Sequence, residues 1–212
     1  KKIKNITLIC QAYGILVTTK KIAMFEPNIQ KLLEHIENFS NSKVLCIGDI
    51  ILDRFTYGEV SRISPEAPIP ILQIKEQKEM LGGAGNVASN VAALGGQTYL
   101  LSAIGQDQIG GNIKAKLASE PNIIPHLVVS PSRQSILKNR FIAGQQQLLR
   151  ADFEDINYLT APEEDELFAK ACQLMAKIDI VILSDYAKGG LKRNLVRGRI
   201  SEAKRAQRMV VI

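Results

Sequence analysis

Residues 44–52 read V-L-C-I-G-D-I-I-L, a nearly unbroken apolar run that decides the fold class. Such a run is typical of a strand in a parallel sheet, because both faces of the sheet are covered there. Residues 179–184 (D-I-V-I-L-S) form a second run of this kind. Residues 98–104, 123–129 and 209–212 also have the composition of strands, and helical patterns separate them. We therefore expect an α/β domain whose parallel strands are joined by right-handed crossovers.

The helix with the strongest signal begins at Thr160. Pro162 lies in its first turn and Glu163 completes a capping box. Its inward side chains are expected to be Leu167, Ala171, Leu174 and Met175. Further helices are predicted at 27–39, 85–94, 109–117 and 191–207, and extended segments at 56–61, 69–75, 135–142 and 147–152, the last two forming a hairpin.

The composition suits one sizeable globular domain, since 46% of the 212 residues are hydrophobic and 23% are charged. The three cysteines are widely spaced and only two histidines occur, which argues against a disulfide framework and a zinc site. The net charge of +6 arises in residues 186–212, which hold eight Lys or Arg and one Glu. We interpret this stretch as the solvated face of a helix, because no aromatic residues are interleaved for base stacking. Nucleic-acid binding is not expected.

The first 23 residues combine a basic start with an apolar run at 6–17. Twelve residues are too few for a membrane span, which needs ~20, and no A-x-A-like cleavage site follows. The expectation is a cytoplasmic protein without a membrane segment. Met24 is a possible alternative start. The apolar residues 209–212 end the chain as a strand begins, which predicts that the chain is a fragment of a longer domain.

Two motifs suit a polyol ligand. Asp53 ends G-D-I-I-L-D (48–53) at the carboxyl end of the first strand, where ligands bind in open α/β sheets. Asp53 has two structural alternatives, as a helix cap or as a partner for Arg54. For Asp49, a structural role and a ligand-binding role fit the pattern equally well. Residues 82–86 (G-G-A-G-N) precede a helix, so backbone amides and Asn86 could approach a ligand, or the segment could be only a tight turn.

Three further motifs are polar. Lys138 and Arg140 share one face of a strand, where two cations repel each other unless an anion or water separates them. A phosphorylated substrate would supply that anion. Residues 184–190 (S-D-Y-A-K-G-G) end the second buried strand and suit either chemistry or a capped turn. Asp107 in G-Q-D-Q-I-G (105–110) is expected to cap a helix.

Six segments, taken in this order, closely resemble a known family. They are GDIILDRF (48–55), SRISPEAPIP (61–70), GGAGNVASN (82–90), GQDQIG (105–110), QQQLLRADFE (145–154) and LSDYAKGG (183–190). The family is the kinase domain of the bacterial bifunctional heptose-7-phosphate kinase/heptose-1-phosphate adenylyltransferases, which belong to the ribokinase-like (PfkB-type) sugar kinases. The resemblance implies an incomplete ribokinase-like three-layer sandwich over residues 44–212, with a small β lid from strands within 54–75 and 135–152. Residues 1–43 would be an extension with a helix.

The resemblance implies ATP- and Mg²⁺-dependent phosphorylation of D-glycero-β-D-manno-heptose 7-phosphate at O1, toward ADP-heptose and the lipopolysaccharide core. It places Asp53 and Asn86 on sugar hydroxyls and Gly82 and Gly83 in the hinge under the lid. Asp185 and Lys188 would lie toward the phosphoryl-transfer region. The lid strands of such kinases often pair between subunits, so a homodimer is expected. We infer charge near the substrate phosphate from Lys138, Arg140 and Arg150. No metal ligand is assigned.

One departure from the family bears on activity. The family's later G-A-G-D segment, which carries the catalytic base, is absent, so the base is expected beyond Ile212 and this chain alone should not turn over. Two alternatives stay open. One is a PfkB-type kinase for ribose, fructose or a nucleoside, and the other is a non-catalytic sugar-binding or dimerisation module.

Overall fold

The computed structural model describes residues 8–10, 15–17, 33–34, 36–154, 157–190, 203 and 205–212. It divides into two compact units, Lys1–Phe39 and Ser40–Ile212. In the first unit, strands β1 (Leu8–Cys10) and β2 (Ile15–Val17) pair antiparallel. Residues 33–34 and 36–37 are helical as predicted, and the side chains of Leu33 and Ile36 are exposed.

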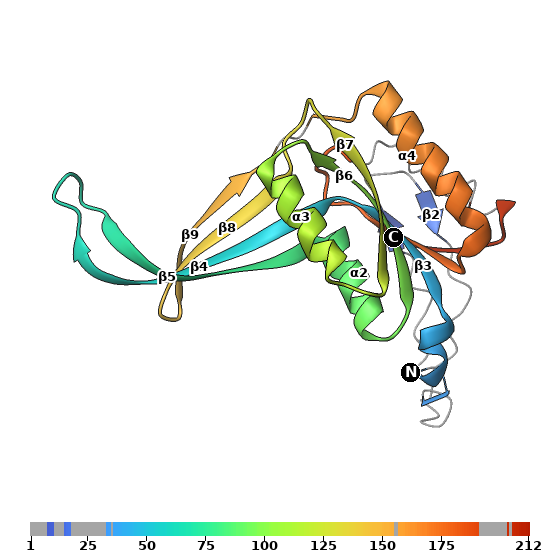
Figure 1. The fold of residues 1–212 in the computed structure, drawn as a ribbon, viewed down its shortest axis with the longest axis horizontal. Helices are drawn as coiled ribbons and strands as arrows, with labels where there is room; N and C mark the ends of the chain where they lie inside the picture. Colours follow the sequence, from blue (N-terminus) through green and yellow to red (C-terminus); the bar gives the residue numbers. More distant parts are fainter. Residues whose placement is uncertain are drawn as a thin grey trace. The chain divides into compact units, whose positions relative to one another are not determined.

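A five-stranded parallel sheet forms the centre of the second unit (Figure 1). Its strand order is β11-β10-β3-β6-β7, and each neighbouring pair is parallel, as the apolar runs predict. The strands are β3 (Lys43–Gly48), β6 (Gln97–Gly105), β7 (Ile123–Ser130), β10 (Ile180–Ser184) and β11 (Met209–Val211). The basic helix predicted at 191–207 lies largely outside the described residues.

Among the described residues, three α-helices cover this sheet: α2 (Ala84–Ala93), α3 (Gln108–Ala118) and α4 (Ala161–Leu174), which continues as the 3₁₀-helix η2 (Met175–Lys177). The connections through α2 and α3 step from β3 towards β7, whereas the connection through α4 returns from β7 to β10. Because right-handed crossovers in opposite directions use opposite faces, α4 covers the face away from α2 and α3. The predicted capping box begins α4, and the Thr160 N–H donates to Glu163 Oε2 at 2.8 Å.

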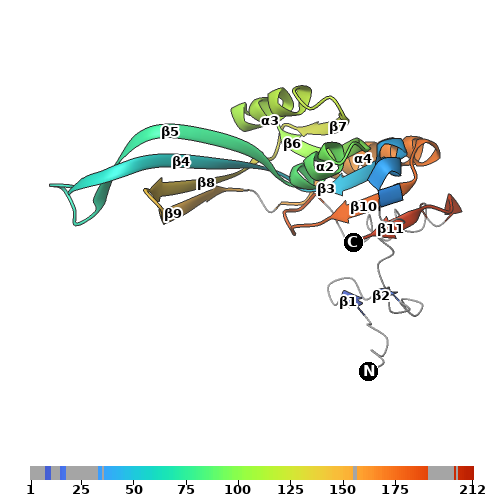
Figure 2. The same ribbon diagram turned by 90° about the horizontal axis from the view of Figure 1, so that it is seen from below.

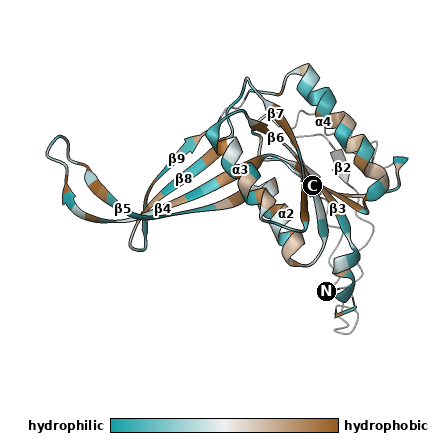
Figure 3. Ribbon diagram, viewed as in Figure 1, coloured by the Kyte–Doolittle hydropathy of each residue, from teal (hydrophilic) through white to brown (hydrophobic). Residues whose placement is uncertain are grey.

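Alternate residues of the parallel strands fill the core between the sheet and the helices α2 and α3. Cys46, Leu100 and Ile104 pack there with Ile113 and Leu117 of α3, all with at most 1% of their surface exposed. Figure 3 shows these strands as the most hydrophobic part of the chain. Burial raises the pKa of the Cys46 thiol to about 12, so this cysteine stays neutral and serves as an apolar core residue.

A second, four-stranded sheet continues from the first and runs away from it in both ribbon views (Figures 1 and 2). Its order is β5-β4-β8-β9, with β4 (Ile50–Ile63), β5 (Pro70–Gly83), β8 (Ile136–Ala143) and β9 (Gln146–Phe153). β4 pairs antiparallel with β5 and parallel with β8, and β8 and β9 form the predicted hairpin.

The prediction of one strand over residues 44–52 is wrong, because the run is shared between the two sheets. β3 ends at Gly48, Asp49 is in neither strand, and β4 begins at Ile50. The hydrophobic pattern does not reveal the change of sheet, because Ile50, Ile51 and Leu52 are buried in the second sheet just as the residues of β3 are buried in the first. The segments predicted at 56–61 and 69–75 are likewise the outer parts of two 14-residue strands.

Candidate functional site

The candidate site lies where β3 and β10 end. These two strands are neighbours, and the direction of the crossovers reverses between them. Ligands of open α/β sheets bind outside the carboxyl ends of the strands at such a reversal. The chain that follows Gly48 enters the second sheet, and the chain that follows Ser184 forms the loop 185–190.

Asp49 holds these two segments together. Its carboxylate is buried and accepts hydrogen bonds from the backbone N–H groups of Tyr186, Lys188 and Gly190, at 3.0, 3.1 and 3.1 Å. The Asp49 carbonyl also accepts from the Ala84 N–H at 2.9 Å, which ties the start of α2 to the same point. Of its two open interpretations, the structural one therefore holds: Asp49 orders the loop 185–190.

A cavity of about 320 Å³ opens beside this junction. Six predicted site residues line it: Asp53, Gly82, Gly83, Asn86, Lys138 and Arg140. Ile51, Phe55, Met80, Leu81 and Tyr186 complete its lining. Segments that are up to 135 residues apart in the chain, from Ile51 to Tyr186, therefore meet around one space.

Asp53 forms an ion pair with Arg140 inside the cavity, and the Arg140 guanidinium lies 5.1 Å from the centre of the Phe55 ring. The two charged side chains are 20% and 23% exposed, so the pair is partly shielded from water. The alternative partner, Arg54, lies on the other face of β4, where it pairs with Glu79 at 2.7 Å. Asp53 is therefore neither a helix cap nor bound to its neighbour in sequence.

The two glycines before α2 fit closely against the acidic residues. A Cβ atom on Gly82 would overlap the Asp53 carboxylate, and one on Gly83 would overlap the Asp49 carbonyl. Gly83 also has φ +57°, a conformation that side chains disfavour. The G-G-A-G-N segment is therefore a close junction at which β5 runs directly into α2, and Asn86 lines the cavity.

Arg150 does not line the cavity. It lies opposite Arg140 in the β8–β9 register, and its guanidinium donates to both oxygens of Asp152 at 2.9 Å. Its side chain is 48% exposed. Arg140 and Arg150 were both expected near a substrate phosphate, and of these two residues Arg140 is the one that lines the cavity.

Asp185 and Lys188 lie in the loop that ends β10, and neither lines the cavity. Asp185 Oδ1 accepts from the Ala187 N–H at 2.8 Å, and Lys188 Nζ pairs with Glu154 at 2.8 Å. Tyr186, between them, is the loop residue that reaches the cavity. Sequence reasoning left Tyr186 and Glu154 out of the site; the only signal for Tyr186 was its place in the motif 184–190.

Asp107 has the structural role that was expected. It caps α3 by accepting from the Gly110 N–H at 2.7 Å, and it accepts from the Ser135 N–H at 2.7 Å. Burial raises the pKa of this carboxyl, but the backbone hydrogen bonds from Ser135 and Gly110 outweigh it and lower the pKa below its usual value. The carboxylate thus joins α3 to the segment that enters β8.

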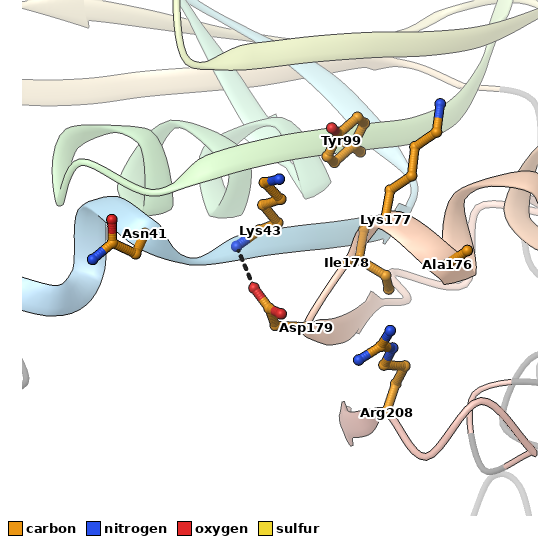
Figure 4. Close-up of a pocket in the computed structure, with 8 residues that line it drawn as sticks. All are labelled: Asn41, Lys43, Tyr99, Ala176, Lys177, Ile178, Asp179 and Arg208. Carbon is orange, nitrogen blue, oxygen red and sulfur yellow. Dashed lines mark hydrogen bonds between the residues drawn. The ribbon is translucent and has the colours of Figure 1, made fainter.

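A second cavity, of about 390 Å³, lies at the other end of the sheet, by the amino ends of β3 and β10 (Figure 4). It is lined by Asn41, Lys43, Tyr99, Ala176, Lys177, Ile178, Asp179 and Arg208. Asp179 accepts from the Lys43 N–H at 2.9 Å, which joins the starts of the two strands. Because ligands of this fold class bind at the carboxyl ends, the cavity around Asp53 is the better candidate.

Within the described ranges, no group of three or more His, Cys, Asp or Glu side chains is placed to hold a metal ion. None of the helices in the part of the chain that the structure describes is both long and apolar enough to cross a bilayer.

Comparison with family models gives a match over residues 41–211 to the pfkB family carbohydrate kinases. The chain belongs to the pfkB family. This pfkB protein is also 43% identical over 175 residues to the bifunctional protein HldE of Caulobacter vibrioides, covering 82% of this chain and 35% of that protein. It is 41% identical over 184 residues to HldE of Paramagnetospirillum magneticum, covering 87% of this chain and 38% of that protein. The pfkB chain therefore spans little more than a third of these relatives.

Solved structures show the same fold. A carbohydrate kinase from Agrobacterium tumefaciens matches with a TM-score of 0.62 and 19% identity, over 80% of this chain and 52% of that one. Phosphofructokinase-2 of Escherichia coli, in complex with substrates and products, matches with a TM-score of 0.61 and 21% identity, over 80% and 52%. The expected ribokinase-like α/β fold is confirmed.

Proposed function

We propose that this pfkB protein is the sugar-binding part of a kinase that transfers a phosphoryl group to O1 of D-glycero-β-D-manno-heptose 7-phosphate. One observation carries the proposal: the cavity at the carboxyl ends of the strands holds Asp53 and Asn86 together with Lys138 and Arg140. Polyol recognition and phosphate recognition thus occur in one space. The similarity to two HldE proteins favours a heptose phosphate over other sugar phosphates.

The side chains have chemistry that suits such a ligand. The Asp53 carboxylate can accept hydrogen bonds from two sugar hydroxyls, and the Asn86 amide can both donate and accept. Gly82 and Gly83 line the cavity without side chains of their own, and the Asp53 carboxylate lies against Gly82. The cations on β8 attract a phosphate, and hydrogen bonds between charged partners are stronger than neutral ones.

The phosphoryl donor in this proposal is ATP with Mg²⁺. Family membership supports ATP as the donor. The described residues include no group of side chains placed to hold the metal ion, and no step of the proposal depends on it. Asp185 and Lys188 stay assigned to the phosphoryl-transfer side because their loop adjoins the cavity through Tyr186. The cytoplasmic location expected from the sequence stays a prediction.

Calorimetric titration of this chain tests the sugar-binding part directly. Heptose 7-phosphate is expected to bind more tightly than ribose or fructose 6-phosphate.

Phosphoryl transfer is measured by coupled ADP release with the longest chain that the gene encodes, using the same three sugars. Strong preference for ribose or fructose 6-phosphate would refute the heptose assignment. Binding without transfer would favour the alternative of a non-catalytic sugar-binding module.

We also propose that two copies associate through the four-stranded sheet. β5 and β9 are its edge strands, and within the described residues no further strand pairs with them. Leu149 and Phe153 on β9 are 59% and 55% exposed, and Ile63 and Ile74 on the β4–β5 hairpin are also exposed. Exposed apolar residues beside an open edge are typical of a self-association surface.

The oligomeric state tests this surface. Analytical ultracentrifugation is expected to show a dimer for the wild-type chain and a monomer for Leu149→Lys/Phe153→Lys. The matched control is Leu94→Lys, at a comparably exposed residue (58%) just after α2. A dimer that survives the double substitution, or one that Leu94→Lys disrupts, would contradict the assignment.

A further inference from the structure

Five charged residues share the cavity-side face of three neighbouring strands. Asp53 of β4, Lys138 of β8 and Asp152 of β9 are successive register partners, and Arg140 of β8 is the partner of Arg150. Register partners point to the same side of a sheet, and so do residues two apart in one strand. The face therefore carries three cations and two carboxylates in two adjacent rows.

The ion pairs on this face run diagonally rather than straight across. Arg140 pairs with Asp53, and Arg150 binds both oxygens of Asp152. The two carboxylates that flank Lys138 in its row are thus each paired with an arginine of the neighbouring row. Lys138 lies between the two carboxylates in the register, yet among the described residues its ammonium group makes no hydrogen bond or ion pair.

Within the described part of this face, one positive charge is therefore left unbalanced, on the Lys138 ammonium at the wall of the cavity. A cation in a partly enclosed space, with its neighbouring carboxylates already paired, attracts an anion strongly. Arg140 differs, because the Asp53 carboxylate and the Phe55 ring hold its guanidinium from two sides. Arg140 donates to Asp53 through Nη1, so its charge is already balanced by a carboxylate, unlike that of Lys138.

We propose that Lys138 recognises the phosphate of the substrate, whereas Arg140 is a positioning residue that orients the Asp53 carboxylate for the sugar hydroxyls. This division of roles rests on the proposed function, which assigns the cavity to a sugar phosphate. It makes Lys138 the residue that distinguishes phosphorylated from unphosphorylated sugar. Arg140 then contributes equally to the binding of the phosphorylated and the unphosphorylated sugar.

The test compares two dissociation constants, for heptose 7-phosphate and for unphosphorylated heptose, measured by calorimetry on the same chain. Lys138→Met is expected to weaken binding of the phosphate ester by roughly 10–100-fold, the effect of losing one hydrogen bond between charged groups, and to leave the free sugar unchanged. Lys138→Arg should restore most of the preference. Arg140→Met should weaken both sugars by a similar factor, so that their ratio stays near that of the wild type.

The matched control is Lys78→Met. Lys78 is the register partner of Phe55 on the same face of the sheet, but it pairs with Glu76 at 3.2 Å and does not line the cavity. It should change neither dissociation constant. Urea unfolding of each variant shows whether a loss of binding reflects a loss of folding. Lys138→Met should unfold like the wild type, because among the described residues the ammonium group makes no hydrogen bond or ion pair that the substitution would remove.

A second probe, inorganic phosphate followed by ¹⁵N NMR, separates failure of this inference from failure of the proposed function. Phosphate should shift amide resonances around Lys138 in the wild type and not in Lys138→Met, whether or not a sugar binds. If the wild type binds no sugar but passes this phosphate test, only the proposed function fails. The inference is overturned if Lys138→Met keeps the wild-type ratio, if Arg140→Met is the variant that lowers it, or if phosphate does not bind the wild-type chain.

Discussion

Replacing Asp49 with alanine is expected to lower the free energy of unfolding by about 3–5 kcal/mol, since it leaves several buried groups without a partner. The substitution removes the acceptor of three backbone N–H groups, those of Tyr186, Lys188 and Gly190. It also opens a gap at a residue that is only 3% exposed. Because the loop 185–190 carries Tyr186 into the cavity, sugar-phosphate binding should weaken as well.

Urea denaturation followed by far-UV circular dichroism measures this effect. Asp49→Asn should fall between the wild type and Asp49→Ala, because it keeps one carbonyl oxygen but turns an NH₂ group towards backbone donors. The matched control is Asp185→Ala, which removes a single hydrogen bond to Ala187 in the same loop and should cost about 1 kcal/mol or less. An Asp49→Ala chain as stable as Asp185→Ala would show that the three hydrogen bonds do not order the loop.

Replacing Gly82 with alanine is expected to abolish detectable binding of heptose 7-phosphate. A Cβ atom at this residue would overlap the Asp53 carboxylate, which must then move away from Arg140 and from the place where a sugar would bind. Gly82 is in β5, which pairs with β4 residue by residue at this point. The backbone is therefore held in place and cannot easily move to make room for the added methyl group. We expect at least a 100-fold weaker affinity, on the order of 3 kcal/mol.

Gly111→Ala is the matched control for this glycine. Gly111 lies in α3 with nothing within 4 Å of a Cβ atom, so alanine should raise the free energy of unfolding by about 0.4–1 kcal/mol and leave binding unchanged. Calorimetry and urea denaturation of both variants give the two quantities. Wild-type affinity in Gly82→Ala would show that Asp53 does not bind the sugar in the orientation that the structure shows.

Local patterns were sufficient to predict most elements of the second unit. Apolar runs predicted the parallel strands β3 and β10, because strands covered on both faces carry almost no polar residues. The capping box predicted the start of α4 to the residue, since both of its hydrogen bonds are made within four positions of the chain. The same locality explains Asp107, whose partner Gly110 is three residues away.

The change of sheet at Asp49 could not be predicted from the sequence, because the run 44–52 is equally apolar on both sides of it. What distinguishes Ile47 from Ile51 is only the partner strand: β6 and β10 for the first, β5 and β8 for the second. Strand partners come from distant segments, and hydrophobicity does not encode which of them a residue meets.

The sequence by itself determined the fold class, the family resemblance and the residue types that a polyol phosphate requires. Only the tertiary structure decided which charges neutralise one another. Lys138, Arg140 and Arg150 look alike along the chain, but the register of β4, β8 and β9 pairs both arginines with carboxylates and, among the residues that the structure describes, leaves the lysine without one. The physical reason is that Coulomb interactions depend on distance in space, and that distance is set by strand pairing rather than by spacing in the chain.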